Sequence, residues 1–106
     1  MKNNKEKSQD EFKVLIKIKN NPYFSQRNLA KTNGFSLGKL NYCLKSLVKK
    51  GYIKINNFKK NKNKIAYGYL LTPKGISYKT KMAYYFMKQK LEEYEELKKE
   101  INEENK

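Results

Sequence analysis

Apolar residues recur with the period of an α-helix between Ser36 and Gly51. The Ser36 hydroxyl can accept a hydrogen bond from an amide of the first turn, and Gly51 can end the helix in a left-handed conformation. The pattern predicts a helix over residues 36–50 with one face for the core and an opposite face that is polar and basic. The apolar positions are Leu40, Cys43, Leu44 and Leu47.

Two shorter apolar patterns precede this helix. The first predicts a helix capped by Ser8 that ends near Asn20, because Asn21 precedes a proline; its buried side is Phe12, Leu15, Ile16 and Ile18, and its first turn holds Asp10 and Glu11. The second predicts a helix over Gln26–Asn33, capped by Ser25 and ended by Gly34, with Leu29, Ala30 and then Phe35 facing the core. Two helices joined by a tight glycine turn are typical of a helix-turn-helix.

The period changes to two after Gly51. Residues 52–56 and 65–71 are predicted to be strands, with Ile53 and Ile55 on one face, and residues 57–64 to be a polar loop. A hairpin that directly follows a helix-turn-helix is typical of the wing of a winged helix.

A long helix is predicted from Pro73 to about Glu104, with Thr72 as its N-cap. A helix of roughly thirty residues is about 45 Å long, more than the preceding head can cover. Its outer half therefore needs a partner, and a second copy of the chain is the simplest one. The candidate dimerisation residues are Tyr84, Met87, Leu91, Tyr94, Leu97 and Ile101.

These elements define the expected fold class, which is mainly α with a small β-hairpin. The architecture is a winged helix-turn-helix with a long C-terminal helix for dimerisation. Residues 1–8 are expected to form a disordered basic tail, residues 9–72 the winged helix-turn-helix DNA-binding domain, and residues 73–106 the dimerisation helix.

Charge is unevenly distributed along the chain. The net charge is +15, and the first 72 residues hold 17 of the 25 basic residues but 3 of the 10 acidic ones. A genome base composition that favours lysine would not explain why acidic residues are rare in the first 72 residues. The distribution indicates a head that binds a polyanion and a C-terminal segment that does not.

Several functional classes find no support in the sequence. There is no histidine and one cysteine, so imidazole-based triads are absent, zinc sites are not expected, and neither is a cofactor. No constellation of residues suggests an enzyme. No apolar run is long enough to span a membrane and residues 1–10 contain no secretory core, so we expect a cytoplasmic protein. Cys43 lies on the apolar stripe and is interpreted as a core residue rather than a redox sensor.

The polar face of the helix over residues 36–50 holds the candidate contacts to DNA bases. Asparagine can pair with adenine, lysine can donate to guanine, and a tyrosine ring can meet a thymine methyl group, which selects Asn41, Tyr42 and Lys45. Phosphate contacts are expected at helix starts and at the tip of the wing. Those candidates are Gln26, Arg27, Ser36, Gly38, Lys39, Lys59, Lys60, Lys62 and Lys64.

The strings SQRNLAKTNGFSLGKLNYCLKSLVKKGYIK and LLTPKG resemble the MarR-type winged-helix transcriptional regulators, over about residues 9–100. SLGKLNYCLK and the Asn- and Lys-rich wing are most similar to a small branch of exopolysaccharide-associated regulators. The resemblance implies a prokaryotic DNA-binding dimer with residues 36–50 in the major groove and the wing on the flanking backbone or minor groove. The chain lacks the extra N-terminal helix of typical members, so dimerisation is expected to depend on the C-terminal helix, and no small-molecule effector is expected.

Two functions from different classes remain open at this point. The first is a homodimeric transcriptional regulator that binds specific double-stranded DNA, with exopolysaccharide genes as targets suggested by the resemblance. The alternative is a winged helix that serves as a protein-interaction or RNA-binding module without sequence-specific DNA binding.

Overall fold

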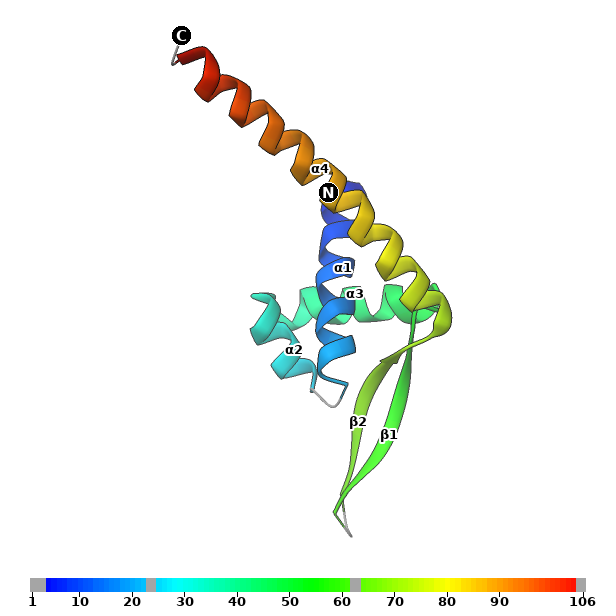
Figure 1. Ribbon diagram of the computed structural model, residues 1–106. Helices are drawn as coiled ribbons and strands as arrows, with labels where there is room; N and C mark the ends of the chain where they lie inside the picture. The colour runs from blue at the N-terminus through cyan, green and yellow to red at the C-terminus, as the bar shows by residue number, and fades with distance from the viewer. Residues whose placement is uncertain (1–3, 23–24, 62–63, 105–106) are drawn as a thin grey trace.

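The computed structural model describes residues 4–22, 25–61 and 64–104, without the side chains of residues 58–67 (Figure 1). Helices build the head of this part of the chain, and a two-stranded antiparallel sheet and a long helix extend from it in different directions. The overall extents are 70 × 28 × 25 Å. The elements are α1 (Asn4–Asn20), α2 (Gln26–Asn33), α3 (Leu37–Lys49), β1 (Ile53–Asn61), β2 (Lys64–Leu71) and α4 (Pro73–Glu104). This is the fold class that the hydrophobic pattern predicts.

Helix α1 begins at Asn4, so residues 4–8 are helical and the prediction of a disordered tail over them was wrong. Ser8 lies inside the helix and does not cap it. Asp10 and Glu11 consequently lie beyond the first turn, and both are buried. Their role is therefore tertiary: Asp10 pairs with Lys39 of α3, and Glu11 pairs with Lys50 directly after it.

The predicted caps of α2 and α3 are confirmed. Ser25 accepts a hydrogen bond from the amide of Asn28, and Ser36 accepts one from the amide of Lys39. Gly34 and Gly51 follow the two helices with φ of 70° and 79°. In each case the amides of the glycine and the next residue donate to carbonyls of the last helical turn, which is a Schellman motif.

The hydrophobic core lies where α1, α2 and α3 meet the start of the hairpin. The apolar stripe of α3 is buried as predicted, with Leu40 and Leu47 fully covered and Cys43 at 5% exposure. Phe35 packs against the edge of this core. The buried apolar residues are Val14, Leu15, Ile18, Leu29, Ala30, Leu40, Cys43, Leu44, Leu47, Ile53 and Tyr69.

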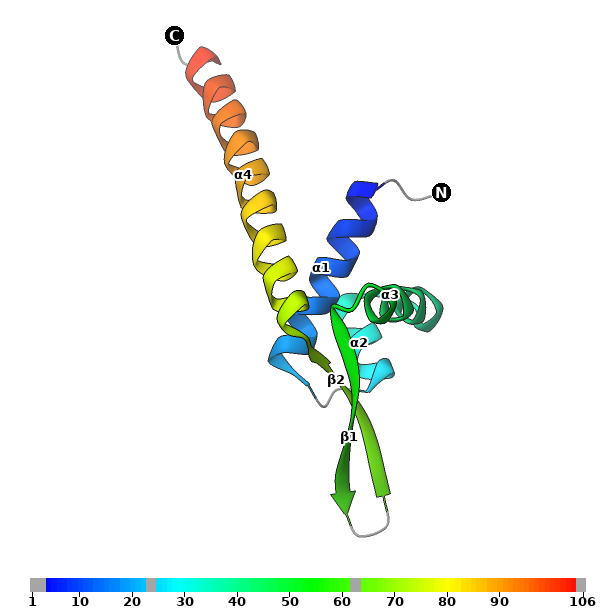
Figure 2. The ribbon, with the colours of Figure 1, turned by 90° about the vertical axis from the view of Figure 1, so that its right-hand side faces the viewer.

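The hairpin is longer than predicted, because most of the polar stretch 57–64 is strand. Strand pairing runs from Ile53 opposite Leu71 to Asn61 opposite Lys64, with an irregularity between Lys59 and Asn61. The strands project away from the head (Figure 2), and their outer part pairs its backbone between the two strands beyond the core. Ile55 is accordingly 57% exposed, although it shares a strand face with the buried Ile53.

Helix α4 is joined to the head at its first turn. Thr72 caps it by accepting a hydrogen bond from the amide of Gly75, and the Tyr52 and Tyr78 rings stack with centroids 4.2 Å apart. Phe12 of α1 contacts Phe86 of α4 with ring centroids 5.2 Å apart, and beyond this contact α4 extends past the head (Figure 2). Within the described residues, no helix is both long and apolar enough to cross a membrane.

Candidate nucleic-acid interface

The outward face of α3 is a stripe of residues at helical spacing opposite the core. Gly38, Tyr42, Lys45 and Lys49 follow one another at intervals of four, three and four residues, and all are exposed. Tyr42 is 64% exposed, and Asn41 lies half-buried beside the stripe. Since α3 contains no acidic residue, this face combines two ammonium groups, a phenol and an amide without opposing charge.

Lys39 does not belong to that outward face. Its Nζ lies 3.5 Å from Asp10 Oδ2 and 4.2 Å from the centroid of the Phe35 ring. The ion pair and the cation–π contact direct the ammonium group toward α1 and the turn before α3. The structure therefore turns Lys39, a predicted phosphate contact, away from the outward face that holds Tyr42 and Lys45.

Glu11 anchors the other end of α3 from inside the protein. Its carboxylate accepts hydrogen bonds from Lys50 Nζ at 2.9 and 3.1 Å and from the Ser46 hydroxyl at 3.0 Å, while the residue is 1% exposed. Burial lowers the pKa of Lys50, but the hydrogen bond and charge of Glu11 outweigh it and raise the pKa above its ordinary value. Burial, followed by the charge of Glu11, raises the pKa of Tyr78 on α4. Of the acids in the first 72 residues, Asp10 and Glu11 are thus turned inward.

Residues of α1 flank one side of the α3 face. Lys7 Nζ lies 5.8 Å from the centroid of the Tyr42 ring, which makes it a cation–π neighbour of a candidate base contact. Lys7 also lines a surface hollow with Tyr42, Lys45 and Lys49, along with Ser46 and Lys50. Neither Lys7 nor Lys49 was among the predicted DNA contacts. Helical spacing already places Lys49 on the polar face with Tyr42, whereas Lys7 reaches this face because α1 begins at Asn4.

The base of the wing flanks the other side. The amide nitrogen of Gln26 donates to the Tyr69 hydroxyl at 2.9 Å, so its side chain, a predicted phosphate contact, joins α2 to β2. A second hollow lies between α3 and the wing. Its lining includes the exposed apolar residues Val48 and Ile55 together with Asn41 and Lys45. Apolar surface therefore adjoins the amide and ammonium groups on this side of α3.

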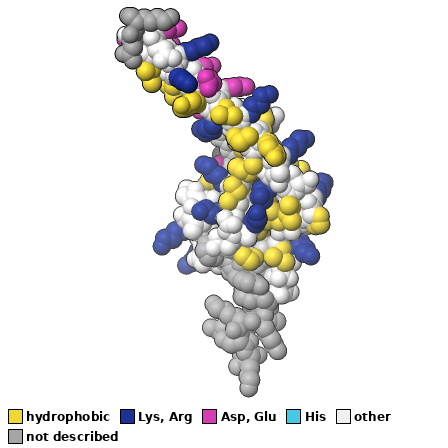
Figure 3. All heavy atoms as spheres, viewed as in Figure 1, with side chains coloured by type: hydrophobic (Ala, Val, Ile, Leu, Met, Phe, Trp, Pro, Cys, Tyr) yellow, Lys and Arg dark blue, Asp and Glu magenta, His cyan; other side chains and the backbone are white. Residues whose placement is uncertain are grey.

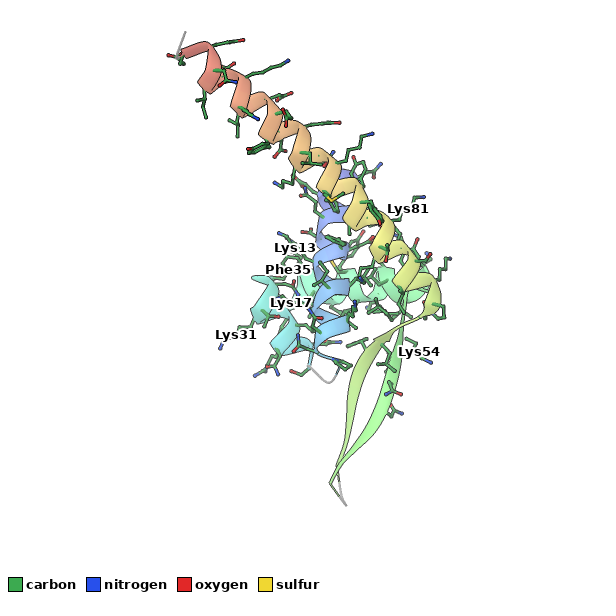
Figure 4. All side chains as sticks on the ribbon, viewed as in Figure 1. Lys13, Lys17, Lys31, Phe35, Lys54 and Lys81 are labelled. Atoms are coloured by element: carbon green, nitrogen blue, oxygen red, sulfur yellow. The ribbon has the colours of Figure 1, made fainter. Side chains whose placement is uncertain are left out.

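The remaining candidates lie on α2, at the start of α3 and on the wing. Arg27, Ser36 and Gly38 are exposed, and a Cβ built on Gly38 would meet no atom within 4 Å. Lys59, Lys60 and Lys64 lie at the far end of the strands, and Lys62 lies outside the described residues. Other lysines, such as Lys13, Lys31 and Lys54, surround the rest of the head (Figure 4). Positive charge is thus general on the head, and the outward face of α3 adds to it the exposed phenol of Tyr42 and the half-buried amide of Asn41.

Metal-ligating side chains do not cluster in the part of the chain that the structure describes. No three His, Cys, Asp or Glu side chains among them come together as a metal site would require. Cys43 is buried, in agreement with its interpretation as a core residue. The chemistry available at this surface is hydrogen bonding and charge complementarity toward an anionic partner.

Comparison with known proteins agrees with this geometry. Residues 11–54 match the family model described as winged helix-turn-helix DNA-binding. A zinc-responsive MarR family member, ZitR of Lactococcus lactis, aligns over 83% of this chain with a TM-score of 0.60 and 23% identity. The chain has the fold of the MarR-family regulators. Its winged helix comprises α1 to β2, with α3 as the second helix of the helix-turn-helix.

Two further solved structures are similar to the chain. MarR of Staphylococcus aureus, in complex with salicylate and kanamycin, gives a TM-score of 0.62 at 16% identity over 81% of this chain. FabT of Streptococcus pneumoniae, in complex with DNA, gives 0.58 at 21% identity, also over 81%. The chain spans 58%, 56% and 57% of ZitR, MarR and FabT, respectively. No curated protein sequence matches the chain.

Proposed function

We propose that this MarR-fold chain is a transcriptional regulator that binds specific double-stranded DNA as a homodimer, with α3 in the major groove. The observation that carries this proposal is the outward face of α3, on which Tyr42, Lys45 and Lys49 are exposed while the neighbouring acids Asp10 and Glu11 are buried. A DNA major groove admits an α-helix and presents acceptors to lysine and asparagine. The winged-helix family match and the similarity to FabT in complex with DNA support the proposal.

The groups on this surface divide into base contacts and backbone contacts. Asn41, Tyr42 and Lys45 are proposed to contact base edges. Lys49 continues their line toward the end of α3 and is proposed to contact a phosphate. Lys7, Arg27 and the start of α3 are proposed to contact phosphates, since Lys7 lines a hollow with Tyr42 and Lys45, and Arg27 is exposed on the preceding helix. Lys59, Lys60, Lys62 and Lys64 of the wing are proposed to lie on the flanking backbone or in the minor groove.

The homodimer is proposed to form through α4. All six candidate dimerisation residues are between 52% and 66% exposed, so they are available to a partner. Exopolysaccharide genes are the proposed targets, on the resemblance of the recognition helix and wing alone.

A footprint of the purified chain on the DNA upstream of its own gene tests the proposal. We expect a protected site with two related halves about one helical turn apart, and much weaker binding to random duplex of the same length. Lys45→Glu should abolish the footprint because it places a carboxylate against the groove. Lys13→Glu is the matched control, since Lys13 is exposed beside Lys17 and Thr32 in a hollow that no α3 residue lines.

The alternative of an RNA-binding module is separated by competition. Structured RNA at equal nucleotide concentration should fail to displace the chain from its duplex site. Equal affinity for random duplex and the upstream region would remove the claim of specificity. Tighter binding to RNA than to either duplex would favour the alternative.

A further inference from the structure

Helix α4 carries an uncovered apolar stripe that is much longer than its attachment to the head. Of the described residues of α4, Gly75 is buried. Tyr78, Met82 and Phe86 are half-buried on the side toward the head. The stripe lies on another side of the helix and reaches from its first turn almost to its last (Figure 3). Its members are Ile76, Tyr84, Met87, Leu91, Tyr94, Leu97 and Ile101, each at least 51% exposed. An uncovered stripe of this length indicates a protein partner.

The two halves of α4 carry opposite charge. Residues 73–90 contain five lysines and no acidic residue, whereas residues 91–104 contain seven glutamates and two lysines. In Figure 3 the acidic side chains in view gather toward the C-terminal end of α4, and Lys81 marks the basic half in Figure 4. The stripe crosses both halves, so any partner along its full length meets a positive and then a negative segment.

These charges find few partners within the helix itself. Among the described residues, one ion pair joins two residues of α4. It lies at the boundary between the halves, where Lys90 Nζ is 3.6 Å from Glu93 Oε2. Glutamates and lysines within reach along one helix would pair at intervals of three or four residues. Segregation of the charges into halves leaves them for a second chain.

We propose that a second copy of the chain covers this stripe with its α4 antiparallel, so that each basic half lies against the partner's acidic half. This inference rests on the homodimer of the proposed function and specifies its geometry. A parallel pair would bury the same stripe but would place lysines beside lysines and glutamates beside glutamates, which is repulsive at both ends. The antiparallel pair reverses both interactions, and its two-fold axis passes near the charge boundary.

The antiparallel arrangement also determines where the two heads lie. Each head is attached at the N-terminal end of its α4, and a helix of 32 residues is about 48 Å long. Antiparallel pairing places the heads at opposite ends of the helix pair, whereas parallel pairing would place them side by side at one end. Separated heads suit two half-sites that are spaced about one turn of DNA apart.

Cysteine cross-linking of the full chain distinguishes the arrangements. Ile76→Cys and Ile101→Cys place thiols at the two ends of the stripe, about 37 Å apart along the helix. Both side chains are exposed, so neither variant disturbs the core, and Cys43 of the parent chain is buried and serves as the background control. With a short bis-maleimide, we expect a mixture of the two variants to give at least tenfold more cross-linked dimer than either variant alone.

Each outcome supports or contradicts the proposal. Strong cross-linking within each single variant would show parallel pairing and overturn it. A dimer by sedimentation with no cross-link in any sample would show that another surface pairs, and would overturn it as well. A chain that sediments as a monomer but keeps its footprint would overturn both the antiparallel pairing and the homodimer, and would leave DNA binding intact. A cross-linked antiparallel dimer that gives no footprint would support the pairing and overturn the proposed DNA binding.

Discussion

At the scale of single residues, Asp10 and Glu11 of α1 bind the buried side of α3. Asp10 pairs with Lys39 at the first turn of α3, and Glu11 pairs with Lys50 just after its last turn. The two ion pairs fix α3 to α1 at both ends, and they remove the negative charge of both acids from the outward face. The inward position of Glu11 therefore connects the stability of the head with the electrostatics of the candidate interface.

Replacement of Glu11 tests this anchor. Glu11→Ala should lower the free energy of unfolding by about 2–3 kcal/mol, because Ser46 and Lys50 lose a buried charged acceptor. Urea denaturation of the two chains measures the difference. Glu93→Gln is the control, since it breaks an exposed ion pair on α4 and should change stability by less than about 0.5 kcal/mol. Equal losses in the two variants would show that Glu11 does not anchor α3.

The same cluster predicts a stability that declines at alkaline pH. The pKa values of Lys50 and Tyr78 are both raised by the fold, from ordinary values of 10.5 and 10.0. Groups with a raised pKa hold their protons more tightly in the native state, so their contribution is complete below the ordinary values and is lost as the pH rises through the raised ones. Urea midpoints measured across this range should fall, and they should fall less steeply in Tyr78→Phe, which cannot ionise. Parallel curves for Tyr78→Phe and the parent would contradict the assignment.

At the scale of elements, the junction between β1 and α4 depends on a close backbone approach. A Cβ added to Gly75 would meet the carbonyl oxygen of Tyr52 at 1.9 Å. That carbonyl accepts a hydrogen bond from the Thr72 amide, and the Tyr52 ring stacks on Tyr78. Tyr52 is therefore fixed through both its backbone and its side chain. Gly75 therefore sets the distance between α4 and the head.

Two glycine substitutions should have opposite effects. Gly75→Ala should destabilise the chain by about 1–3 kcal/mol, because backbone must move to admit the methyl group. Gly38→Ala, in the first turn of α3, should be neutral or stabilising by up to about 1 kcal/mol, since its Cβ would lie in open space. Thermal unfolding compares the two variants. Should Gly38→Ala nevertheless weaken the footprint, a DNA backbone that approaches Gly38 closely would account for the loss.

Elements with local signals could be predicted from the sequence. Ser25, Ser36, Gly34 and Gly51 mark helix ends through hydrogen bonds within a few residues, and all four were predicted correctly. The hairpin was underestimated because residues 57–61 carry no apolar alternation, which a strand outside the core does not need. The start of α1 at Asn4 also lacks a local capping signal, whereas Ser8 inside the helix resembles one.

The candidate interface could be predicted in part. Helical spacing was enough to place Tyr42 and Lys45 on the exposed face of α3. Lys39 and Gln26 are equally polar, but tertiary contacts distinguish them from Tyr42 and Lys45. Lys39 lies against Asp10, and Gln26 donates to Tyr69. The contact of Lys7 with Tyr42 joins residues 35 positions apart, which no periodicity within one element reveals.

At the scale of the whole molecule, the chain combines a basic head with a helix that extends well beyond it. The head carries one α3 face, so a homodimer would present every proposed phosphate contact twice. Each phosphate contact contributes about 0.9 to the slope of log affinity against log salt. Salt dependence can therefore count both the contacts and the heads that make them.

Lys49→Ala provides this count. On a duplex with the complete footprint, the variant should have a salt slope smaller in magnitude than the parent by about two, because a dimer loses one contact from each head. On a duplex with a single half-site the reduction should be about one. Fluorescence anisotropy at several salt concentrations measures both slopes, with Lys13→Ala as the exposed lysine that should change neither. A reduction of about one on both duplexes would mean that a single head engages the DNA, and no reduction on either would exclude Lys49 from the phosphate contacts.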